Sequence, residues 1–223
     1  MKGLYAIIDL GTLDAIQADP VLFGQAVLAA KPAALQLRAK DASARRVLSL
    51  LRALLPLCRA AGVPLIVNDR PEYAALAGCE FVHIGQTDMS TVRARTIAPS
   101  VGVGVSTHDT TQLARAIGDG PSYIAFGPVY ATSSKADSEA VVGIDGLRVA
   151  YERTRAAGVP LVAIGGIYAD RIEEVAPFSD AIAMIAALVP PGLPTDAGWY
   201  DAVSAGAIAM SQAIVAATNS LAS

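Results

Sequence analysis

The sequence is poor in charge and in cysteine, and each scarcity excludes a class of protein. Only 17% of its 223 residues are charged and the formal net charge is −3, so the chain lacks the general basic surface that nucleic-acid binding requires. The only cysteines are Cys58 and Cys79, which are too few for a disulfide framework. We expect buried free thiols in a reducing cytoplasm. Hydrophobic residues make up 53% of the chain and predict a large buried core.

We also expect no targeting segment and no membrane span. Residues Met1–Leu10 carry one lysine, and Asp9 interrupts their apolar run, which is unlike a signal peptide. The tail Ala202–Ser223 has no formal charge, but its polar residues and many alanines make it too weakly hydrophobic for a convincing span. We interpret residues 196–223 as a final helical segment packed on the fold. A subunit contact there, and thus a homodimer, is left open.

Short apolar segments alternate with helix-like segments along the chain, without a change of composition that would mark a second domain. This alternation is typical of a parallel sheet covered by helices on both sides. Eight such units in about 220 residues predict a single-domain (β/α)8 TIM barrel over residues 1–223, with a doubly wound open sheet as the alternative. The predicted strands are Leu4–Asp9, Ala34–Lys40, Pro64–Val67, Phe81–Ile84, Val101–Val105, Tyr123–Gly127, Pro160–Ile164 and Ala181–Ile185.

The segment Ala34–Lys40 alternates apolar and polar residues, which predicts a strand. Its polar residues Gln36, Arg38 and Lys40 share one face, although Lys and Arg are rarely buried without a partner. An exposed edge strand is one explanation. Other predicted strands also end in polar residues, however. If those ends meet, the two cations supply positive charge to a shared pocket that suits a phosphate-bearing ligand.

Carboxylates follow two neighbouring predicted strands. Asp69 comes after the third strand and Asp88 after the fourth, at the barrel end where active sites are found. Two carboxylates beside a cationic pocket repel each other unless a cation lies between them, and Mg²⁺ binds one or two carboxylates together with phosphate oxygens. The alternative is that each aspartate caps the helix that follows it. Because Arg38 and Lys40 are expected nearby, we favour a metal–diphosphate site.

The remaining candidates also lie at or after strand ends. Both histidines, His83 and His108, are placed there, but no spacing indicates a zinc site or a hydrolytic triad. The long loop Pro128–Val142 contains Thr132-Ser133-Ser134-Lys135, whose hydroxyls and lysine suit phosphate oxygens, unless the loop is only a solvated connection. Gly165-Gly166 follows the seventh strand and lets backbone N–H groups approach an anion.

Taken in order, these motifs resemble the thiamine phosphate synthase family, over roughly Leu4 to Leu188. The resemblance implies a TIM barrel that joins 4-amino-5-hydroxymethyl-2-methylpyrimidine diphosphate to a thiazole phosphate, giving thiamine phosphate and pyrophosphate. It implies Mg²⁺ as the cofactor and these two small molecules as the partners. The motifs that carry the resemblance are Gln36-Leu37-Arg38-Ala39-Lys40, Asn68-Asp69-Arg70, His83-Ile84-Gly85-Gln86-Thr87-Asp88, Gly104-Val105-Ser106-Thr107-His108, Gly127-Pro128-Val129-Tyr130, Thr132-Ser133-Ser134-Lys135 and Ala163-Ile164-Gly165-Gly166-Ile167.

The family pattern implies a role for each matching residue. Gln36 would contact the amino edge of the pyrimidine, Asp69 and Asp88 would bind Mg²⁺, and His83 would be a further substrate-binding residue. Cations and metal aimed at the departing pyrophosphate lower the barrier without a protein nucleophile. The diphosphate would be bound by Arg38, Lys40, Asn68, Ser106 and Lys135, of which all but Asn68 would be catalytic, and the thiazole phosphate by Thr132, Ser134 and the backbone of Gly165 and Gly166.

The sequence departs from the family pattern at three positions. Ala131 stands where the family usually has proline, Ser134 where it has threonine, and Ala186 where it commonly has serine. The missing hydroxyl at Ala186 removes part of the expected thiazole-phosphate site, although backbone N–H groups can serve there. Two alternatives stay open. One is a thiazole tautomerase with a histidine such as His108 as acid or base, and the other is a non-catalytic barrel that binds thiamine precursors.

Overall fold

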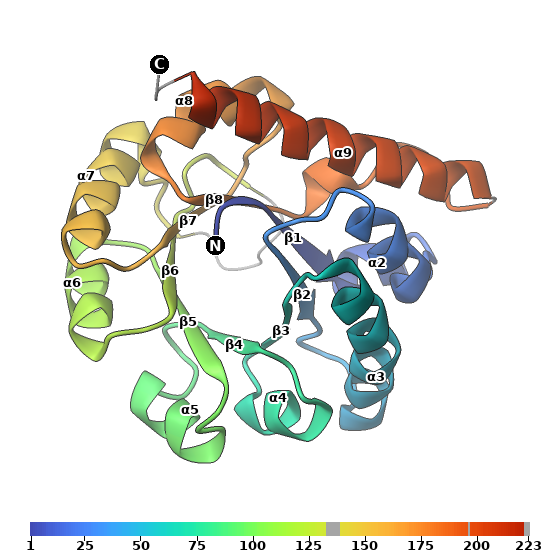
Figure 1. The fold of residues 1–223 in the computed structure, drawn as a ribbon, viewed down its shortest axis with the longest axis horizontal. Coiled ribbons are helices and arrows are strands. Elements are labelled where there is room, and N and C mark those ends of the chain that lie inside the picture. Colours follow the sequence, from blue (N-terminus) through green and yellow to red (C-terminus); the bar gives the residue numbers. More distant parts are fainter. Residues whose placement is uncertain (133–138, 196, 221–223) are drawn as a thin grey trace.

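The computed structural model describes residues 1–132, 139–195 and 197–220, and its strands form one closed barrel (Figure 1). Each strand pairs in parallel with the next along the chain, and β8 pairs with β1 to close the ring. This closure confirms the predicted (β/α)8 TIM barrel and excludes the open sheet. The strands are β1 (Gly3–Asp9), β2 (Ala34–Arg38), β3 (Leu65–Asn68), β4 (Phe81–Ile84), β5 (Gly102–Thr107), β6 (Tyr123–Phe126), β7 (Leu161–Ile164) and β8 (Ala181–Met184).

Helices surround the barrel on the outside (Figure 1). Among them, α1 (Leu10–Ala15) is absent from the predicted elements, and it begins directly after β1 because Asp9 caps it. The Asp9 carboxylate accepts a hydrogen bond from the backbone N–H of Thr12 at 3.0 Å. The other helices are α2 (Pro20–Leu28), α3 (Ala44–Ala61), α4 (Pro71–Ala77), α5 (Thr91–Ile97), α6 (Thr110–Asp119), α7 (Gly143–Ala156), α8 (Ile172–Val175) and α9 (Ala197–Asn219), with 3₁₀ turns at Ala169–Arg171, Ala176–Phe178 and Ala186–Leu188.

The alternation of side chains along each strand separates two buried regions. In β2, Leu35 and Leu37 belong to the large core between the strands and the helices. Gln36, between them, faces the barrel interior. That interior is filled mainly by small apolar side chains and by two tyrosines, Tyr5 of β1 and Tyr123 of β6. The pattern read from the sequence therefore places the polar face of β2 inside a closed barrel and not on an exposed edge.

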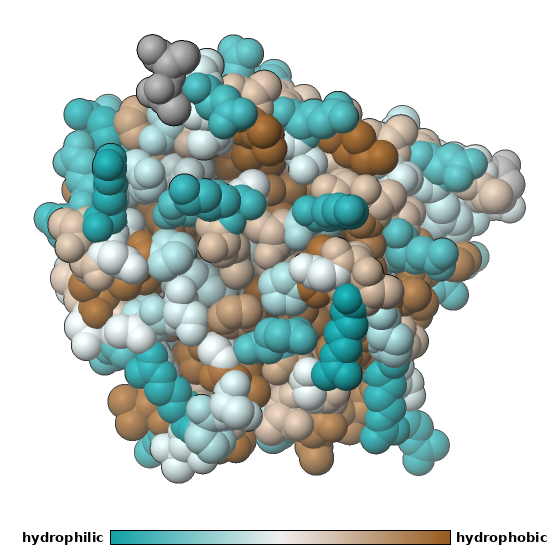
Figure 2. Space-filling view, in the orientation of Figure 1, coloured by the Kyte–Doolittle hydropathy of each residue, from teal (hydrophilic) through white to brown (hydrophobic). Residues whose placement is uncertain are grey.

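Helix α9 runs along the outside of the barrel and packs chiefly on α2 (Figure 1). Its inner side buries Trp199, Val203, Ala207 and Ile214, and the Trp199 ring lies 6.3 Å from the ring of Phe23. By length and composition alone α9 could cross a membrane, with a mean hydropathy of 1.2, but one such helix is weak evidence for a span. Over α9, Figure 2 shows hydrophilic and hydrophobic side chains side by side on the visible face.

Candidate active site

The carboxyl ends of the parallel strands meet at one mouth of the barrel, and polar side chains concentrate there. Arg38 is the last residue of β2 and Asn68 the last residue of β3. His83 lies one residue before the end of β4, and Ser106 one residue before the end of β5. Lys40 lies in the turn after β2, two residues beyond the end of the strand, and its side chain is exposed.

Gln36 is held from both sides in the barrel interior. The Tyr5 hydroxyl donates to Gln36 Oε1 at 2.5 Å, and Gln36 Nε2 donates to Asn68 Oδ1 at 2.8 Å. Both Tyr5 and Gln36 are buried. A buried amide with both its oxygen and its nitrogen bonded has a fixed orientation, which suits recognition of a polar ring edge.

A second set of buried hydrogen bonds continues from the same tyrosine. The hydroxyls of Tyr5 and Tyr123 lie 2.8 Å apart, and His83 Nδ1 lies 3.0 Å from the Tyr123 hydroxyl. On the other side of the ring, His83 Nε2 lies 2.8 Å from Ser106 Oγ. Burial raises the pKa of both tyrosines well above the ordinary value. The phenols are therefore neutral at physiological pH.

Arg38 is paired with Asp9, a residue that the sequence analysis did not select. Asp9 ends β1 opposite Arg38 in the strand register, and its carboxylate forms an ion pair with the guanidinium. The same carboxylate also accepts from the backbone N–H and the hydroxyl of Thr12. Because the Arg38 and Asp9 side chains are only 15% and 6% exposed, the pair holds the guanidinium in one place at the mouth.

Asp69 and Asp88 meet, and neither caps a helix. The residue before α4 is Arg70 without a side-chain cap, and α5 is capped by Ser90, so the capping alternative is wrong for both aspartates. Asp69 has a left-handed backbone with φ of 64°, and the backbone N–H of Gly85 donates to the Asp88 carboxylate at 2.8 Å.

The Asp69 carboxyl is set up to share a proton with Asp88. Burial, a hydrogen bond with Asp88 and the Asp88 charge together raise the pKa of Asp69 to about 6. Lys40 and Arg38 lower it less strongly, which places both cations within electrostatic reach of Asp69. Two oxygen ligands that repel each other, next to cations that attract phosphate, match the way Mg²⁺ is held by one or two carboxylates plus phosphate oxygens.

The donor set also argues against a zinc site. In the described ranges, no group of three or more His, Cys, Asp or Glu side chains comes together. A zinc site of the usual kind would need three or four such ligands. The Asp69–Asp88 pair fits a metal that takes its remaining ligands from substrate and water.

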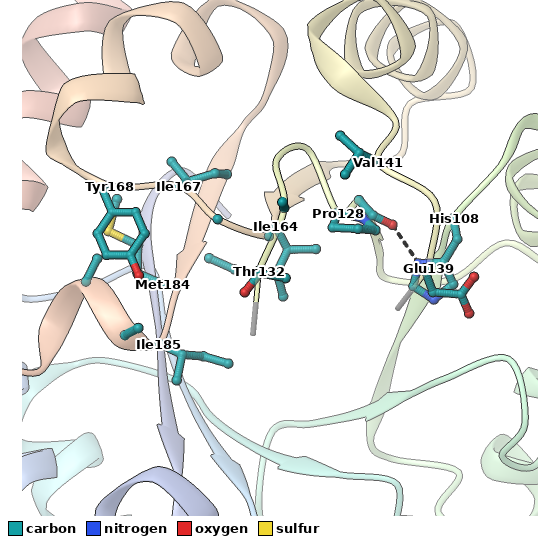
Figure 3. Close-up of a pocket in the computed structure, with 17 residues that line it drawn as sticks. His108, Pro128, Thr132, Glu139, Val141, Ile164, Ile167, Tyr168, Met184 and Ile185 are labelled. Carbon is teal, nitrogen blue, oxygen red and sulfur yellow. Dashed lines mark hydrogen bonds between the residues drawn. The ribbon is translucent and has the colours of Figure 1, made fainter. Parts of the chain in front are cut away.

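A separate, mainly apolar cavity of about 190 Å³ lies among the loops that follow β5 to β8 (Figure 3). His108 stands at one side of it and donates from Nδ1–H to the backbone carbonyl of Gly127 at 2.6 Å. Thr132 lies at the rim and its side chain is exposed. Glu139, which the sequence analysis did not select, is a further polar side chain of the lining.

Two of the loops that line this cavity pack backbone against backbone. Gly165 and Gly166 both have positive φ, and a Cβ on Gly165 would lie 2.5 Å from the Cα of Pro128. The loop after β7 therefore packs directly on the loop after β6, which requires glycine there. Ala186 also lines the cavity, at the start of a 3₁₀ turn, where a family serine would have added a hydroxyl.

The described site residues thus fall into three neighbouring groups around one mouth. Asp9 could have been selected as a site residue from the sequence, because it ends a predicted strand as several selected residues do. Tyr5 and Tyr123 gave no such sign, because a buried aromatic residue is typical of any core. The first group is the interior chain of Gln36, Asn68, His83 and Ser106 with the two tyrosines. The second is the charged cluster of Arg38, Lys40, Asp69 and Asp88, and the third is the cavity with His108, Thr132, Gly165 and Gly166. Ser134 and Lys135 lie outside the described residues.

A closed (β/α)8 barrel with this concentration of polar groups at the carboxyl ends of its strands defines a TIM-barrel enzyme. The sequence model of the family described as thiamine monophosphate synthase matches residues 4–188. The chain belongs to that family, whose members are transferases of thiamine biosynthesis.

Individual relatives agree with this assignment. The chain is 36% identical to the thiamine-phosphate synthase of Chloroflexus aurantiacus over 83% of its own length and 84% of the relative. It is 40% identical to the thiamine-phosphate synthase of Koribacter versatilis, over 85% and 90% of the two chains. Among solved structures, the thiamine phosphate pyrophosphorylase from Pyrococcus furiosus superposes with a TM-score of 0.81 at 26% identity, covering 96% of each chain.

Proposed function

We propose that this chain joins 4-amino-5-hydroxymethyl-2-methylpyrimidine diphosphate to a thiazole phosphate, and so forms thiamine phosphate and pyrophosphate. Family membership supports the reaction. The observation that carries the assignment to this site is the Asp69–Asp88 carboxyl pair within reach of Arg38 and Lys40. A sensor or an isomerase would not need a metal-binding pair beside two cations.

The diphosphate is assigned to the charged cluster. Arg38 and Lys40 attract its oxygens, and Lys135 would join them from the loop after β6. Asp9 keeps the Arg38 guanidinium oriented, so little reorganisation is needed when the substrate arrives. Mg²⁺, when bound by Asp69 and Asp88, would neutralise negative charge on the departing pyrophosphate.

The pyrimidine ring is assigned to the barrel interior, with Gln36 at its amino edge and His83 beside it. Asn68 and Ser106, which the family pattern gives to the diphosphate, are hydrogen-bonded to Gln36 and His83 and so lie next to the ring in this assignment. An electron-rich aminopyrimidine can support a cationic methylene group after pyrophosphate leaves. The barrel interior then has two tasks, which are to hold the ring in one orientation and to keep water from the cation. Both tasks suit buried or half-buried side chains that are held in place by hydrogen bonds to one another.

The thiazole phosphate is assigned to the cavity of about 190 Å³ after β5 to β8. Its apolar lining suits the ring, and the backbone of Gly165 and Gly166, with the hydroxyls of Thr132 and Ser134, suits the phosphate. Ala186 offers no hydroxyl, so the backbone carries more of the phosphate binding here than the family pattern implies.

The experiment is an assay of the purified chain with both substrates and Mg²⁺. We expect thiamine phosphate and pyrophosphate in equal amounts, and only when both substrates are present. Asp88→Ala is expected to lower turnover at least 100-fold without changing the circular dichroism spectrum, because Asp88 lies at a loop and not in the core. An unchanged rate would remove Asp88 from the mechanism.

His108 lies beside the cavity, and this position supports one competing activity, the tautomerisation of the thiazole. Its Nδ1–H is used by the Gly127 carbonyl, which leaves Nε2 as a proton acceptor or donor. Proton exchange on the thiazole phosphate without pyrophosphate release would favour that isomerase. Tight binding of both substrates without turnover would favour a non-catalytic binder.

We also infer a cytoplasmic enzyme, with a homodimer through α9 as its assembly. Burial raises the pKa of both Cys58 and Cys79 to about 12, so the two free thiols are unreactive, as suits a reducing compartment. The outer face of α9 is uncharged between Ala202 and Asn219, which is compatible with a subunit contact.

A further inference from the structure

Six buried or half-buried side chains, each from a different strand, form one continuous chain of hydrogen bonds across the barrel interior. The sequence pattern assigns substrate contacts to both ends of this chain and nothing to the two tyrosines at its centre. The chain of residues, which we term the interior relay, runs through Ser106, His83, Tyr123, Tyr5, Gln36 and Asn68.

We propose that Tyr5 and Tyr123 are positioning residues that carry a single direction of hydrogen bonding through the interior relay, from Ser106 to Asn68, and thereby fix which atoms Gln36 and Ser106 offer to the substrate. The reading of the substrate rests on the proposed function. The direction of the relay does not, because it follows from the orientations of the Gln36 and Asn68 amides and from the proton counts of their partners.

The direction begins at Gln36. Its nitrogen Nε2 lies 2.8 Å from the carbonyl oxygen of Asn68 and has to donate. Its oxygen Oε1 lies 2.5 Å from the Tyr5 hydroxyl, which has to donate to it. Rotating the Gln36 amide by half a turn would set its carbonyl oxygen against the carbonyl oxygen of Asn68, two acceptors with no proton between them.

Counting protons extends the direction to the other end of the relay. Each neutral phenol has one proton, and burial keeps both phenols neutral by raising their pKa. Since Tyr5 donates to Gln36, Tyr123 has to donate to Tyr5, and His83 Nδ1–H has to donate to Tyr123. A neutral imidazole that donates from Nδ1 accepts at Nε2, so Ser106 donates its proton to His83.

Ring packing holds the relay in place independently of the hydroxyls. The rings of Tyr5 and Tyr123 have centroids 5.8 Å apart, and His83 stacks on Tyr123 at 5.6 Å with an interplanar angle of 20°. Phe81 meets the edge of the Tyr123 ring at 6.1 Å. Replacing either tyrosine with phenylalanine therefore removes a hydroxyl and leaves these contacts.

The fixed direction gives the site a defined polarity. Gln36 keeps one N–H and one lone pair of Oε1 for a ligand, and these match a ring nitrogen beside an amino group. A 4-oxo ring presents an N–H beside a carbonyl, which is the reverse pattern. Ser106 keeps only its lone pairs, so its side chain fits a substrate N–H and not an anionic phosphate oxygen, which revises the role that the family pattern implies.

The kinetic test uses Tyr5→Phe, with Tyr151→Phe in helix α7, a half-buried tyrosine on the outer side of the barrel wall, as the matched control. We expect Tyr5→Phe to raise the KM of the pyrimidine diphosphate about tenfold and to leave the KM of the thiazole phosphate unchanged. Its kcat/KM preference for the 4-amino substrate over a 4-oxo analogue should fall at least tenfold, while Tyr151→Phe changes neither value. An unchanged preference, or an equal rise in both KM values, would overturn the proposal.

The spectroscopic test needs no turnover and separates this proposal from the proposed function. The chain has two histidines, so ¹⁵N-histidine labelling of His108→Gln leaves His83 as the only ring. We expect neutral His83 to carry its proton on Nδ1, and Tyr123→Phe in the same background to shift it toward Nε2. A proton on Nε2 without that substitution would overturn the relay direction. The Nδ1 tautomer in a chain that makes no thiamine phosphate would uphold the relay and count against the proposed function.

Discussion

At the scale of single residues, the site depends on charges that are held in place by neighbours. Arg38 is fixed by Asp9, and Asp69 by its left-handed backbone and by Asp88. Aspartate is one of the few residues other than glycine that tolerates positive φ, which explains how the proposed metal ligand Asp69 can occupy such a position. The position of each of these charged side chains is therefore set by its neighbours and its backbone.

Removal of the Arg38 side chain is expected to weaken one substrate selectively. Arg38→Ala should raise the KM of the pyrimidine diphosphate about 10- to 100-fold in steady-state assays, because a charge-assisted contact to the diphosphate is lost. The KM of the thiazole phosphate should stay the same. Equal weakening of both substrates would contradict the assignment.

Arg46→Ala is the matched control for that variant. Arg46 also pairs with an aspartate, Asp14, but both side chains are more than 40% exposed and lie on the outside of the barrel. An exposed ion pair contributes at most about 1 kcal/mol to the free energy of unfolding. Arg46→Ala should therefore change neither KM.

The raised pKa of Asp69 predicts that the proposed Mg²⁺ binding depends on pH. Below about pH 6 Asp69 is protonated and the proton competes with the metal, so the Mg²⁺ affinity measured by calorimetry should fall as pH decreases from 7.5 to 5. Above pH 7 it should level off. In Asp69→Asn, which tolerates the same backbone conformation, binding should be weak and nearly independent of pH.

The same shift has a consequence for stability. The pKa of Asp69 rises from 3.8 in the unfolded chain to about 6 in the fold. The contribution of protonated Asp69 to the free energy of unfolding is therefore fully present below pH 3.8 and is lost as pH rises through 6. Mg²⁺ should offset this loss, and it should raise the melting temperature more at pH 7.5 than at pH 5. An equal rise at both pH values would place the metal elsewhere.

At the scale of elements, the sequence predicts all eight strands but misses the short helix α1. Alternation in Ala34–Arg38 and short apolar runs elsewhere mark every strand, because the pleat imposes a period of two. Helix α1 is missed because six residues are too few to show a helical period of apolar residues. The only indication of it in the sequence is Asp9, which caps it. The groups at the strand ends were predictable from topology, whereas the meeting of Tyr5 with Tyr123 depends on packing across the barrel.

Strand β5 shows how closely the elements constrain the relay. A Cβ on Gly104 would lie 2.0 Å from Cζ of Tyr123, so Gly104→Ala has to displace that ring. In urea unfolding we expect the free energy of unfolding to fall by about 1–3 kcal/mol, as for other overpacked cores. The His83 tautomer should change as well, because Tyr123 moves.

The control for this substitution is another glycine in open space. Gly118 lies within α6, and a Cβ there would meet nothing within 4 Å. Gly118→Ala should stabilise the protein by about 0.5–1 kcal/mol, because alanine favours the helix. If both variants changed stability equally, close packing at Gly104 would not be the cause.

At the scale of the whole molecule, the barrel divides the proposed reaction between its two halves. Among the described residues, the groups assigned to the diphosphate and metal lie in or directly after β1 to β4, and the cavity assigned to the thiazole phosphate lies among the loops after β5 to β8. The interior relay joins the halves, since it runs from Ser106 of β5 to Asn68 of β3. One polypeptide can thus hold two substrates on either side of the barrel axis with the reacting atoms between them.

Helix α9 lies outside this division, and its role can be tested at two alanines that are two residues apart and lie on opposite sides of the helix. Ala207 is fully buried against the barrel, whereas Ala209 is exposed. Ala207→Asp would bury an unpaired carboxylate and is expected to lower the free energy of unfolding by more than about 3 kcal/mol in urea. Ala209→Asp adds the same charge to the same helix in water, so it should cost less than about 0.5 kcal/mol.

Because α9 is also the proposed subunit contact, sedimentation of Ala209→Asp should show a monomer where the unaltered chain is a dimer. A dimer that tolerates Ala209→Asp would place the contact on another face and leave α9 as a cover for α2 and β1 alone.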